Sequence, residues 1–555
     1  MRTKAATHRR RRRRRLRWTQ VYALFLVACL THTGCFNEEP STYYGQSVPP
    51  RVQEFRWSDG GLPQTFDPAF AAAPPDTDAV RALFEGLTDY DPQTLAPIPA
   101  VATRWESSYE GRVWTFYLHD EARWSNGEKV TATDFVRSWQ RTLKIGPLAP
   151  HTELLANIQG ATATESPAGS TKATPHFGAK AINEHTLQVT LEHADNGFPE
   201  LVAHPVFRPV KLRDADRTEP IKSEELISNG AFQLSATETD RVHLERAHNY
   251  WDGSSVALER VTFVNTPNPE AALSAYRAGE LDAVTNAAFE PLALKLLAPY
   301  KDFRRSTYGA LTYYVFNIER EPFDDVRVRE ALALAIDRER ISRVDLGGAV
   351  EPAGTFLPEA ISGEKPVVDK AELLDQDVNK ARELLAQAGY PEGENFPVIK
   401  LLINRNEQQR IVAQSIATMW RTALNIQTEI VIKGWYEYEA AIEAGDFDVV
   451  RRGLVMQTTS ESTNFAMLFG RNGHPTPAPA GPIDIPPATA TPQPPPETLI
   501  ESEVQALKEL KAMPIYFASS YSLVKPYVSG FDRNVLDVPL LKRTRLDTNW
   551  SEQAR

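Results

Sequence analysis

The sequence predicts an α/β fold, and three observations lead to that prediction. Residues 376–450 alternate between segments with the apolar spacing of helices and segments with the spacing of strands. Residues 51–300 contain short β-prone segments separated by turn-forming residues. The whole chain of 555 residues is 42% hydrophobic and 24% charged, as in ordinary folded proteins. A chain of this length has room for roughly three to five domains.

Residues 51–300 contain two strand candidates and one helix candidate. Val113–Leu118 and Thr186–Leu191 alternate between apolar and polar residues, which predicts two half-buried strands. A helix is expected from Thr133 to Leu143, with Thr133 or Asp134 as its N-terminal cap.

Residues 376–450 predict a helix followed by a β-α-β-α-β unit. The segments come in this order: helix 378–388, strand 398–403, helix 411–420, strand 426–432, helix 435–444 and strand 447–450. Crossovers of this kind give parallel strands that are covered by helices. Ligands of such sheets bind beyond the carboxyl ends of the strands.

Residues 472–497 interrupt this pattern, because ten of these 26 residues are proline. A segment of this composition predicts a solvated loop or linker. After it, a helix is expected over residues 500–510 and a strand over residues 514–517.

The first 35 residues differ from the rest of the chain. They carry ten Lys or Arg residues and no acidic residue, and the run Arg9–Arg15 precedes the apolar stretch Trp18–Leu30. That stretch is shorter than the ~20 residues of a transmembrane helix, so the pattern predicts an export signal. A nuclear or nucleic-acid-binding patch is the alternative interpretation. The remaining residues hold 51 basic against 72 acidic side chains, which argues against a nucleic-acid partner.

Only two cysteines occur, Cys29 and Cys35, which excludes a disulfide-stapled scaffold. The sequence LVAC that ends at Cys29 resembles the processing site of bacterial lipoproteins, in which the cysteine is lipidated and becomes the new N-terminus. The sequence HTGC that ends at Cys35 is similar at its last positions, so both cysteines are candidates. The resemblance implies a lipoprotein signal peptide over residues 1–35, a polar tether over residues 36–50, and a location in the periplasm or at the cell surface, anchored to the membrane by lipid.

No catalytic or metal-binding motif is found in the sequence. There is no HExxH, no GxSxG, no phosphate-binding loop and no GxGxxG after a strand. The eleven histidines show no spacing typical of metal ligands. Asp324 and Asp325 are expected to cap a helix that starts near Val326. We therefore expect no enzymatic activity, no metal and no cofactor.

Several blocks, in this order along the chain, resemble one family. They are RALFEGL at 81–87, WTFYLH at 114–119, ARWSNG at 122–127, VTATDFVRSWQR at 130–141, NYWD at 249–252, PFDDVRVREAL at 322–332 and LVKPYVSG at 523–530. On these blocks the chain resembles the family 5 solute-binding proteins of peptide ABC transporters, over about residues 55–545.

The resemblance implies a two-lobed periplasmic-binding-protein fold with a hinge and an extra domain inserted in lobe I. The implied boundaries are 50–84, 209–310 and 518–550 for lobe I, 85–208 for the inserted domain, and 311–517 for lobe II, which includes the Pro-rich loop 472–497. Strands near 311–317 and 514–520 would form the hinge.

The implied function is the capture of oligopeptides and their delivery to the permease subunits of an ABC transporter. The lobes of a monomer would close around an extended ligand, because the ligand contacts both of them. The alternatives are a binding protein of the same fold for another solute (a nickel chelate, haem, an opine or a sugar) and a degenerate sensor or adaptor without a transport role.

The chain departs from the family around the expected ligand site. In peptide binders of the family, one strand carries an Arg, then a Trp, and soon an Asp that pairs with the α-ammonium of the peptide. Here Arg451 matches the Arg, Leu454 stands in place of the Trp, and Gln457 stands in place of the Asp. A buried ammonium that loses its carboxylate is destabilised by about 3–5 kcal/mol. We therefore expect a cleft that takes an extended peptide without clamping a free N-terminus.

Four further positions follow from the same resemblance. Ala72 stands where members often have Glu, His151 where they have Tyr, and Gln409 where they have His. Trp435 matches a tryptophan of the ligand site, although a Trp on the core face of a helix is an equal interpretation. The candidate ligand-binding residues are thus Trp435, Arg451, Gln457, Leu454, His151 and Gln409.

Overall fold

The computed structural model describes residues 42–161, 177–212, 214, 217–362, 374–473, 500, 502–532 and 534–551. The chain forms two compact units, Met1–Thr42 and Tyr43–Arg555, and the description below concerns the second. The predicted signal peptide with Cys29 and Cys35 lies outside the described residues, as do residues 474–497 of the Pro-rich segment. Within the described ranges, no helix is both long enough and apolar enough to cross a membrane.

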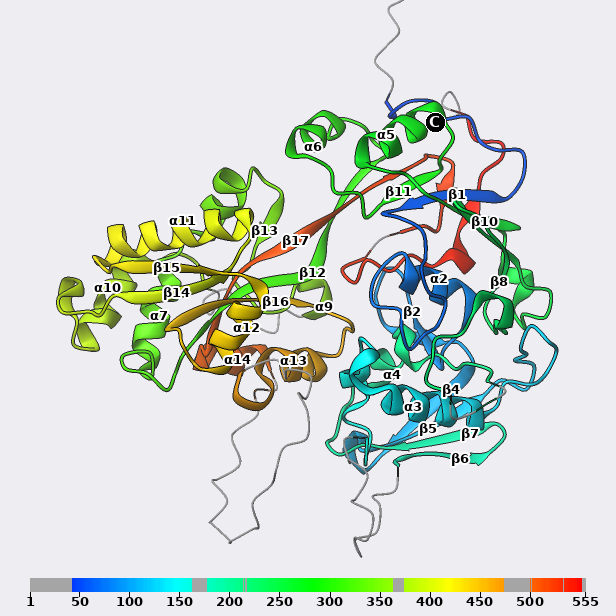
Figure 1. The fold of residues 1–555 in the computed structure, drawn as a ribbon, viewed down its shortest axis with the longest axis horizontal. Coiled ribbons are helices and arrows are strands. Elements are labelled where there is room, and N and C mark those ends of the chain that lie inside the picture. Colours follow the sequence, from blue (N-terminus) through cyan, green and yellow to red (C-terminus); the bar gives the residue numbers. More distant parts are fainter. Residues whose placement is uncertain are drawn as a thin grey trace, which may run out of the picture. The chain divides into compact units, whose positions relative to one another are not determined.

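A mixed sheet of eleven strands runs through the second unit (Figure 1). Its main path has the order β15-β14-β16-β12-β17-β11-β1-β10-β9-β8, and β13 pairs with β17. The strands are β1 (Glu54–Asp59), β8 (Phe232–Thr237), β9 (Arg241–Arg246), β10 (Arg260–Val264), β11 (Ala283–Thr285), β12 (Phe303–Phe316), β13 (Val350–Pro352), β14 (Ile399–Asn404), β15 (Thr428–Lys433), β16 (Val449–Val455) and β17 (Ala512–Val524).

Two long antiparallel strands, β12 and β17, connect the two parts of this sheet. They pair from Phe303 opposite Leu523 to Val315 opposite Ala512. β12 also pairs with β16, and β17 also pairs with β11 (Figure 1). Both strands therefore pass from one part of the sheet into the other. Of the segments that we expected at a hinge, β12 contains residues 311–316 and β17 contains residues 514–520.

The apolar side chains form two large clusters. One cluster contains the apolar residues of β12, β14 and β16 together with helices α7 (Val326–Leu334), α10 (Val378–Gln387) and α11 (Glu407–Leu424). The other contains those of β1, β9 and β10 together with helices α2 (Asp76–Leu83) and α3 (Ala132–Ile145). Each part of the sheet thus has a hydrophobic core of its own.

The predicted β-α-β-α-β unit is confirmed. β14 pairs in parallel with both β15 and β16, so the local order is β15-β14-β16. α11 connects β14 to β15, and α12 (Trp435–Glu443) connects β15 to β16. The two connections run in opposite directions along the sheet, so right-handed crossovers place α11 and α12 on opposite faces (Figure 1).

A separate four-stranded antiparallel sheet lies between α2 and β8 in the sequence. Its order is β4-β5-β7-β6, with β4 (Ala102–Ser108), β5 (Val113–Leu118), β6 (Ala179–Asn183) and β7 (Thr186–Thr190), which confirms both predicted strands. The cap prediction for α3 was wrong. The N-cap is Thr131, and Asp134 at the third helical position completes a capping box with it.

The remaining elements differ from expectation mainly in length. Asp325 caps α7 as predicted, since its Oδ1 accepts a hydrogen bond from the Arg327 amide at 2.8 Å. The helix expected over 500–510 is shorter, and the strand expected over 514–517 is the much longer β17. The other elements are β2 (Thr88–Tyr90), β3 (Pro97–Pro99), α4 (Phe198–Leu201), α5 (Pro269–Ala278), α6 (Pro291–Leu297), α8 (Arg338–Arg340), α9 (Glu359–Ser362), α13 (Glu461–Gly473), α14 (Glu503–Glu509), β18 (Val528–Ser529) and β19 (Arg545–Leu546).

Candidate functional site

Three of the predicted site residues follow the carboxyl ends of the three parallel strands. Gln409 lies in the first turn of α11, after β14 ends at Asn404. Trp435 begins α12, after β15, and Gln457 comes two residues after β16. Parallel strands present these ends at one edge of the sheet, which is the usual ligand position in such folds.

One face of β16 and its neighbours carries a row of polar side chains. Arg451 lies opposite Tyr314, and Gly453 lies opposite Thr312. Thr312 also lies opposite Tyr516 of β17. Residues directly opposite each other share a face of the sheet. Nη2 of Arg451 donates a hydrogen bond to Oγ1 of Thr312 at 3.4 Å. The guanidinium lies close over Gly453, where an added Cβ would be 3.0 Å from that same Nη2.

Several polar atoms of this row are buried and lack a hydrogen-bond partner among the described residues. They are Nε of Arg451, Oε1 of Gln409 and the hydroxyl of Tyr314. Gln409 joins the row because its Nε2 donates to the Tyr516 hydroxyl at 3.0 Å. Burial raises the pKa of Tyr314, so its phenol stays protonated and remains a donor. Because buried polar atoms normally have partners, this row is suited to a ligand with carboxylate and amide groups.

The opposite face of β16 is structural. Arg452 points there and forms an ion pair with Glu439 of α12 at 3.3 Å. Leu454 is an odd number of residues from Arg451, so it lies on the face that Arg452 shares. It pairs with Leu311 and packs against the larger apolar cluster. The structure therefore does not bring Leu454 together with Arg451.

Trp435 lies at the surface. Its side chain is 60% exposed, and its ring contacts that of Tyr438 with centroids 5.7 Å apart. Tyr438 in turn donates a hydrogen bond to the carbonyl of Arg451. The exposure argues against Trp435 as a core residue, and its place at the sheet edge is open to a ligand.

A second set of predicted residues meets around His204, which the sequence analysis missed. Nε2 of His151 lies 2.9 Å from the Ala72 carbonyl. The rings of His151 and His204 contact edge to face, with centroids 4.8 Å apart. Nε2 of His204 lies 3.2 Å from Oε1 of Gln457. Ala72, His151 and Gln457, which are far apart in the sequence, thus form one connected group.

The protonation state of His204 follows from its contacts. Burial lowers the pKa of His204 well below its usual value, and the neighbouring His151 adds to the effect. Nδ1 accepts a hydrogen bond from the Val206 amide at 3.2 Å. His204 is therefore neutral, with its proton on Nε2, and this N–H donates a hydrogen bond to Oε1 of Gln457.

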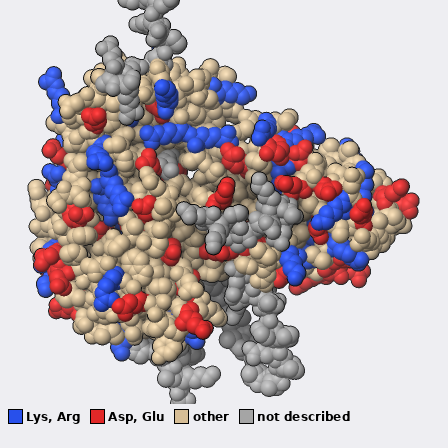
Figure 2. All heavy atoms as spheres, turned by 180° about the vertical axis from the view of Figure 1, so that it is seen from behind, with Lys and Arg blue, Asp and Glu red and all other residues tan. Residues whose placement is uncertain are grey.

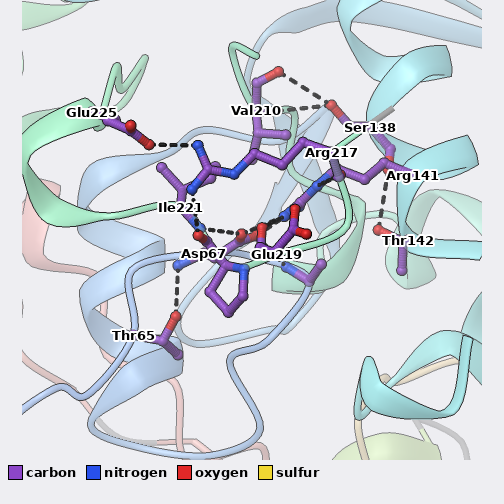
Figure 3. A network of polar contacts seen from close by, with 12 residues as sticks. Thr65, Asp67, Ser138, Arg141, Thr142, Val210, Arg217, Glu219, Ile221 and Glu225 are labelled. Atoms are coloured by element: carbon purple, nitrogen blue, oxygen red, sulfur yellow. Dashed lines mark hydrogen bonds and ion pairs between the residues drawn. The ribbon is translucent and has the colours of Figure 1, made fainter. Parts of the chain in front are cut away.

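A buried ion pair fixes the loop that carries Ala72 (Figure 3). Arg141 of α3 binds Asp67 through Nη1 to Oδ1 at 2.9 Å and Nη2 to Oδ2 at 2.7 Å. The Asp67 Oδ1 also accepts from the Ala69 amide, and Oδ2 accepts from the Ile221 amide. The pair therefore holds residues 67–71, which lead directly to Ala72.

Residues 195–204 contact the segment after β16 at further points. Ser462 donates to Oδ1 of Asp195 at 2.9 Å. The approach at Gly197 is close, since an added Cβ would lie 2.6 Å from Oγ of Ser460. With the His204–Gln457 contact, these interactions order the residues that follow β16.

Two carboxylates, those of Glu461 and Glu200, are considered as partners for the ammonium group of a peptide. Oε1 of Glu461 accepts a hydrogen bond from the Glu503 amide at 3.0 Å, at the start of α14. Oε2 of Glu200 is buried without a partner in the described part of the chain, and burial raises the pKa of this carboxyl. Glu461 is therefore engaged, whereas Glu200 keeps an unused oxygen.

Two of the family-like blocks meet in a buried charge cluster elsewhere. Glu85 of RALFEGL accepts from the Tyr250 hydroxyl at 2.5 Å and from the Trp251 indole at 2.7 Å, both in NYWD. Nζ of Lys542 lies 3.4 Å from Glu85 and 3.1 Å from Asp89. These contacts give both blocks a structural role.

Metal sites and strongly charged surfaces were also considered for the parts that the structure describes. No group of three or more His, Cys, Asp or Glu side chains there could hold a metal ion. On the face that Figure 2 shows, basic and acidic side chains are interspersed rather than gathered into a patch of one sign. The polar row on β16 and the His204 group thus remain the candidate site.

Comparison with known proteins places this geometry in a family. Residues 96–475 match the family described as bacterial extracellular solute-binding proteins, family 5 middle. The chain is 34% identical over 419 residues to the periplasmic murein peptide-binding protein MppA of Escherichia coli (strain K12), covering 73% of this chain and 76% of that protein. It is 30% identical over 489 residues to the periplasmic oligopeptide-binding protein OppA of Salmonella typhimurium (strain LT2), covering 85% of this chain and 89% of that protein.

A solved structure of MppA, described as the periplasmic murein tripeptide binding protein in its unliganded open form, matches with a TM-score of 0.74 and 28% identity. The match covers 90% of this chain and 98% of that one. The neighbours are two-lobed periplasmic binding proteins, which confirms the predicted fold class. Members of the family are binding proteins rather than enzymes. The chain belongs to the family 5 bacterial extracellular solute-binding proteins.

Proposed function

We propose that this protein captures peptides outside the cytoplasm and delivers them to the permease subunits of an ABC transporter. Its relatives include proteins described as binding murein peptides and oligopeptides. The observation that carries the proposal is the polar row of Arg451, Thr312, Tyr314, Tyr516 and Gln409, whose unpaired buried atoms match the carboxylate and amide groups of a peptide. The protein acts as a monomeric receptor and performs no bond chemistry on its ligand.

A lipid anchor on Cys29 or Cys35 holds the protein at the membrane. The basic run, the short apolar stretch and the lipoprotein-like processing site support this part of the proposal. Acyl chains stabilise membrane binding by ~0.8 kcal/mol for each buried methylene, and stable anchoring needs more than one chain. The protein then resides in the periplasm or at the cell surface.

Ligand capture occurs by rotation about β12 and β17. These are the two strands shared by both parts of the large sheet, and each part has its own apolar core. A peptide that contacts both parts favours the closed arrangement by the difference between its two binding free energies. The proposed domain limits are lobe I at 50–84, 209–310 and 518–550, the inserted domain at 85–208, and lobe II at 311–517.

The site favours the carboxylate of a peptide over its free amine. Gln457 stands where peptide binders of the family have an ammonium-binding Asp, and its amide oxygen accepts a hydrogen bond from His204. Glu461 is engaged at the start of α14. Arg451, in contrast, forms no ion pair with an acidic side chain within the described ranges, and its buried Nε has no hydrogen-bond partner there.

Calorimetry with two neighbouring arginine variants tests the proposal. Ligand that co-purifies from the native host is identified by mass spectrometry and titrated into the ligand-free protein. Arg451→Gln should weaken binding by roughly 10- to 100-fold, the worth of a charge-assisted hydrogen bond. Arg452→Gln is the matched control, because Arg452 lies on the other face and pairs with Glu439. Equal losses in the two variants, or no peptide binding by the wild type, would refute the proposed site.

Acetylated and free-amine forms of the same peptides test the amine preference. We expect their dissociation constants to agree within about threefold, since no carboxylate clamps the amine. A strong preference for the free amine would contradict this expectation, and Glu200→Gln would then show whether the unused oxygen of Glu200 supplies the contact. Intact recovery of the peptides after incubation with the protein checks that it does not hydrolyse them.

A further inference from the structure

Helix α6 exposes two leucines side by side. Leu292 is 68% exposed and Leu296 is 66% exposed, and residues four apart share one face of a helix. Leu297 on the other side is 2% exposed and packs in a small apolar cluster with residues of α5 and β11. Lys295 lies between the two leucines in the sequence and is also exposed. This surface (Leu292, Lys295 and Leu296), here called the α6 face, is apolar with a basic group at its edge.

The first residues of the second unit, from Tyr43 on, lie close to the segment that follows α6. The Tyr44 amide donates to both carboxylate oxygens of Asp302, at 2.9 and 3.1 Å. The Tyr44 ring lies 5.2 Å from the ring of Tyr300, only four residues after Leu296. Lys525 donates to the Tyr44 carbonyl at 3.2 Å. The entry point is thus bonded to the segment that directly follows the α6 face.

The next residues are fixed against α5, which lies beside α6 in Figure 1. Gly45 has φ +79°, and a Cβ there would lie 2.5 Å from backbone atoms of Arg277. The Gln46 amide donates to the Arg277 carbonyl at 2.9 Å. Of the predicted tether 36–50, residues 44–46 therefore pack on the body, and any anchor upstream is joined to a fixed point of its surface.

Covalent length sets how far that point can lie from an anchored cysteine. The chain from Cys35 to Tyr43 reaches at most about 27 Å when fully extended, and the chain from Cys29 at most about 48 Å. These lengths confine the α5–α6 end of the body to the neighbourhood of the membrane. Exposed leucines beside a lysine are the composition of surfaces that insert into the headgroup region, with the lysine reaching back to the phosphates.

We propose that the α6 face docks on the phospholipid bilayer that holds the anchor, with Leu292 and Leu296 inserted among the headgroups and Lys295 against their phosphates. The inference rests on the lipid anchoring proposed above. Docking orients the body, so that the sheet edge with the ligand site keeps a constant direction relative to the membrane.

Hydrogen exchange on the lipidated full chain tests the docking. The protein is placed in nanodiscs of three parts phosphatidylethanolamine and one part phosphatidylglycerol. Amides of residues 292–297 should exchange on the order of fivefold more slowly than in the soluble chain that lacks residues 1–35. The double variant Leu292→Ser/Leu296→Ser should lose this slowing while it remains in the disc. Leu148→Ser, at a leucine that is 76% exposed and lies outside α6, should keep the slowing.

Three results would each contradict a different part of the proposal. An intact-mass measurement without diacylglyceryl would overturn the anchor, and the docking with it. A lipidated, disc-bound protein whose α6 amides exchange as fast as in the soluble chain would overturn the docking alone. Slowing that appears only when permease subunits share the disc would assign the α6 face to the permease instead.

Discussion

Removal of Arg141 should destabilise the fold strongly, because its partner would remain buried. The side chains of Arg141 and Asp67 are 1% and 0% exposed, and the two form a bidentate pair (Figure 3). The guanidinium also donates to the carbonyls of Arg217 and Glu219. Breaking one side of such a pair costs about 3–5 kcal/mol, since an uncompensated charge stays in the interior. We expect Arg141→Met to lower the free energy of unfolding by that amount.

The double variant separates two free energies: the cost of leaving one buried charge without its partner, and the net contribution of the ion pair to stability. Asp67→Leu/Arg141→Met removes both charges, and such apolar replacements are often close to neutral. It also removes the Asp67 acceptors of the Ala69 and Ile221 amides, so we expect an intermediate loss of about 1–3 kcal/mol. The double variant should therefore be more stable than Arg141→Met alone.

Urea unfolding of the soluble chain, followed by far-UV circular dichroism, measures both changes. Arg410→Met is the matched control, because Arg410 pairs with Glu407 on the surface of α11 and should change little. A loss below ~1 kcal/mol for Arg141→Met would refute the reasoning. A double variant that loses the sum of the two single effects would refute it as well.

Three further variants probe the site and its surroundings. The pKa of His204 is lowered in the folded state, so below about pH 6.5 the unfolded state gains a proton at this residue and the folded state does not. The free energy of unfolding of the wild type should therefore fall by about 1.4 kcal/mol relative to that of His204→Asn as the pH drops from 7.5 to 5.5. Burial raises the pKa of Glu503 to about 7, so the free energy of unfolding of the wild type should fall by up to about 3 kcal/mol relative to that of Glu503→Gln as the pH rises from 4 to 8. Urea unfolding at each pH measures the difference between wild type and variant for both His204 and Glu503. A difference that does not change with pH would contradict the prediction for that residue. Gly453→Ala should displace the Arg451 guanidinium and weaken peptide binding roughly tenfold in calorimetry with unchanged unfolding, and an unaltered affinity would contradict the placement of Arg451.

Local sequence patterns were sufficient for the β-α-β-α-β unit. Strand β14 and helix α11 have clean apolar patterns, because β14 is buried on both faces and α11 buries one face. Strand β15 alternates in the sequence as well, although none of its residues is fully buried. The N-cap of α3 could also have been assigned correctly from the sequence, by the capping-box rule. Thr131, with Asp134 three residues later, fits a capping box, whereas Thr133 has no such partner.

The long strands were underestimated for a tertiary reason. The first residues of β12 include Arg304 and Arg305, which read as a polar segment in the sequence. In the fold, the Arg305 guanidinium lies 2.5 Å from the carboxylate of Glu351 in β13, and that of Arg304 lies 3.5 Å from the carboxylate of Asp532. Pairing with β17 and these remote acids makes the segment a strand, and none of those partners is local.

The candidate site was predictable where it follows strand ends, and it was not predictable where it depends on remote contacts. Gln409 and Gln457 come after strands whose parallel order the sequence indicates. The distance of three residues between Arg451 and Leu454 already places them on opposite faces of any strand. His204 gave no local signal, because its contact with Gln457 joins residues 253 apart in the sequence.

The contact between His204 and Gln457 also limits what a ligand can gain there. Without ligand, the Gln457 amide oxygen already accepts a hydrogen bond from a neutral histidine. A peptide amine that took this oxygen would replace one hydrogen bond by another, so the net gain would be small. Arg451 offers a charge and a buried Nε that has no partner among the described residues, so we expect a ligand carboxylate to form a bond there without breaking one to an acid. We therefore propose that affinity depends on the polar row of β16, and that Gln457, in place of the aspartate that the resemblance implies, shifts recognition from the amine of the peptide to its acidic groups.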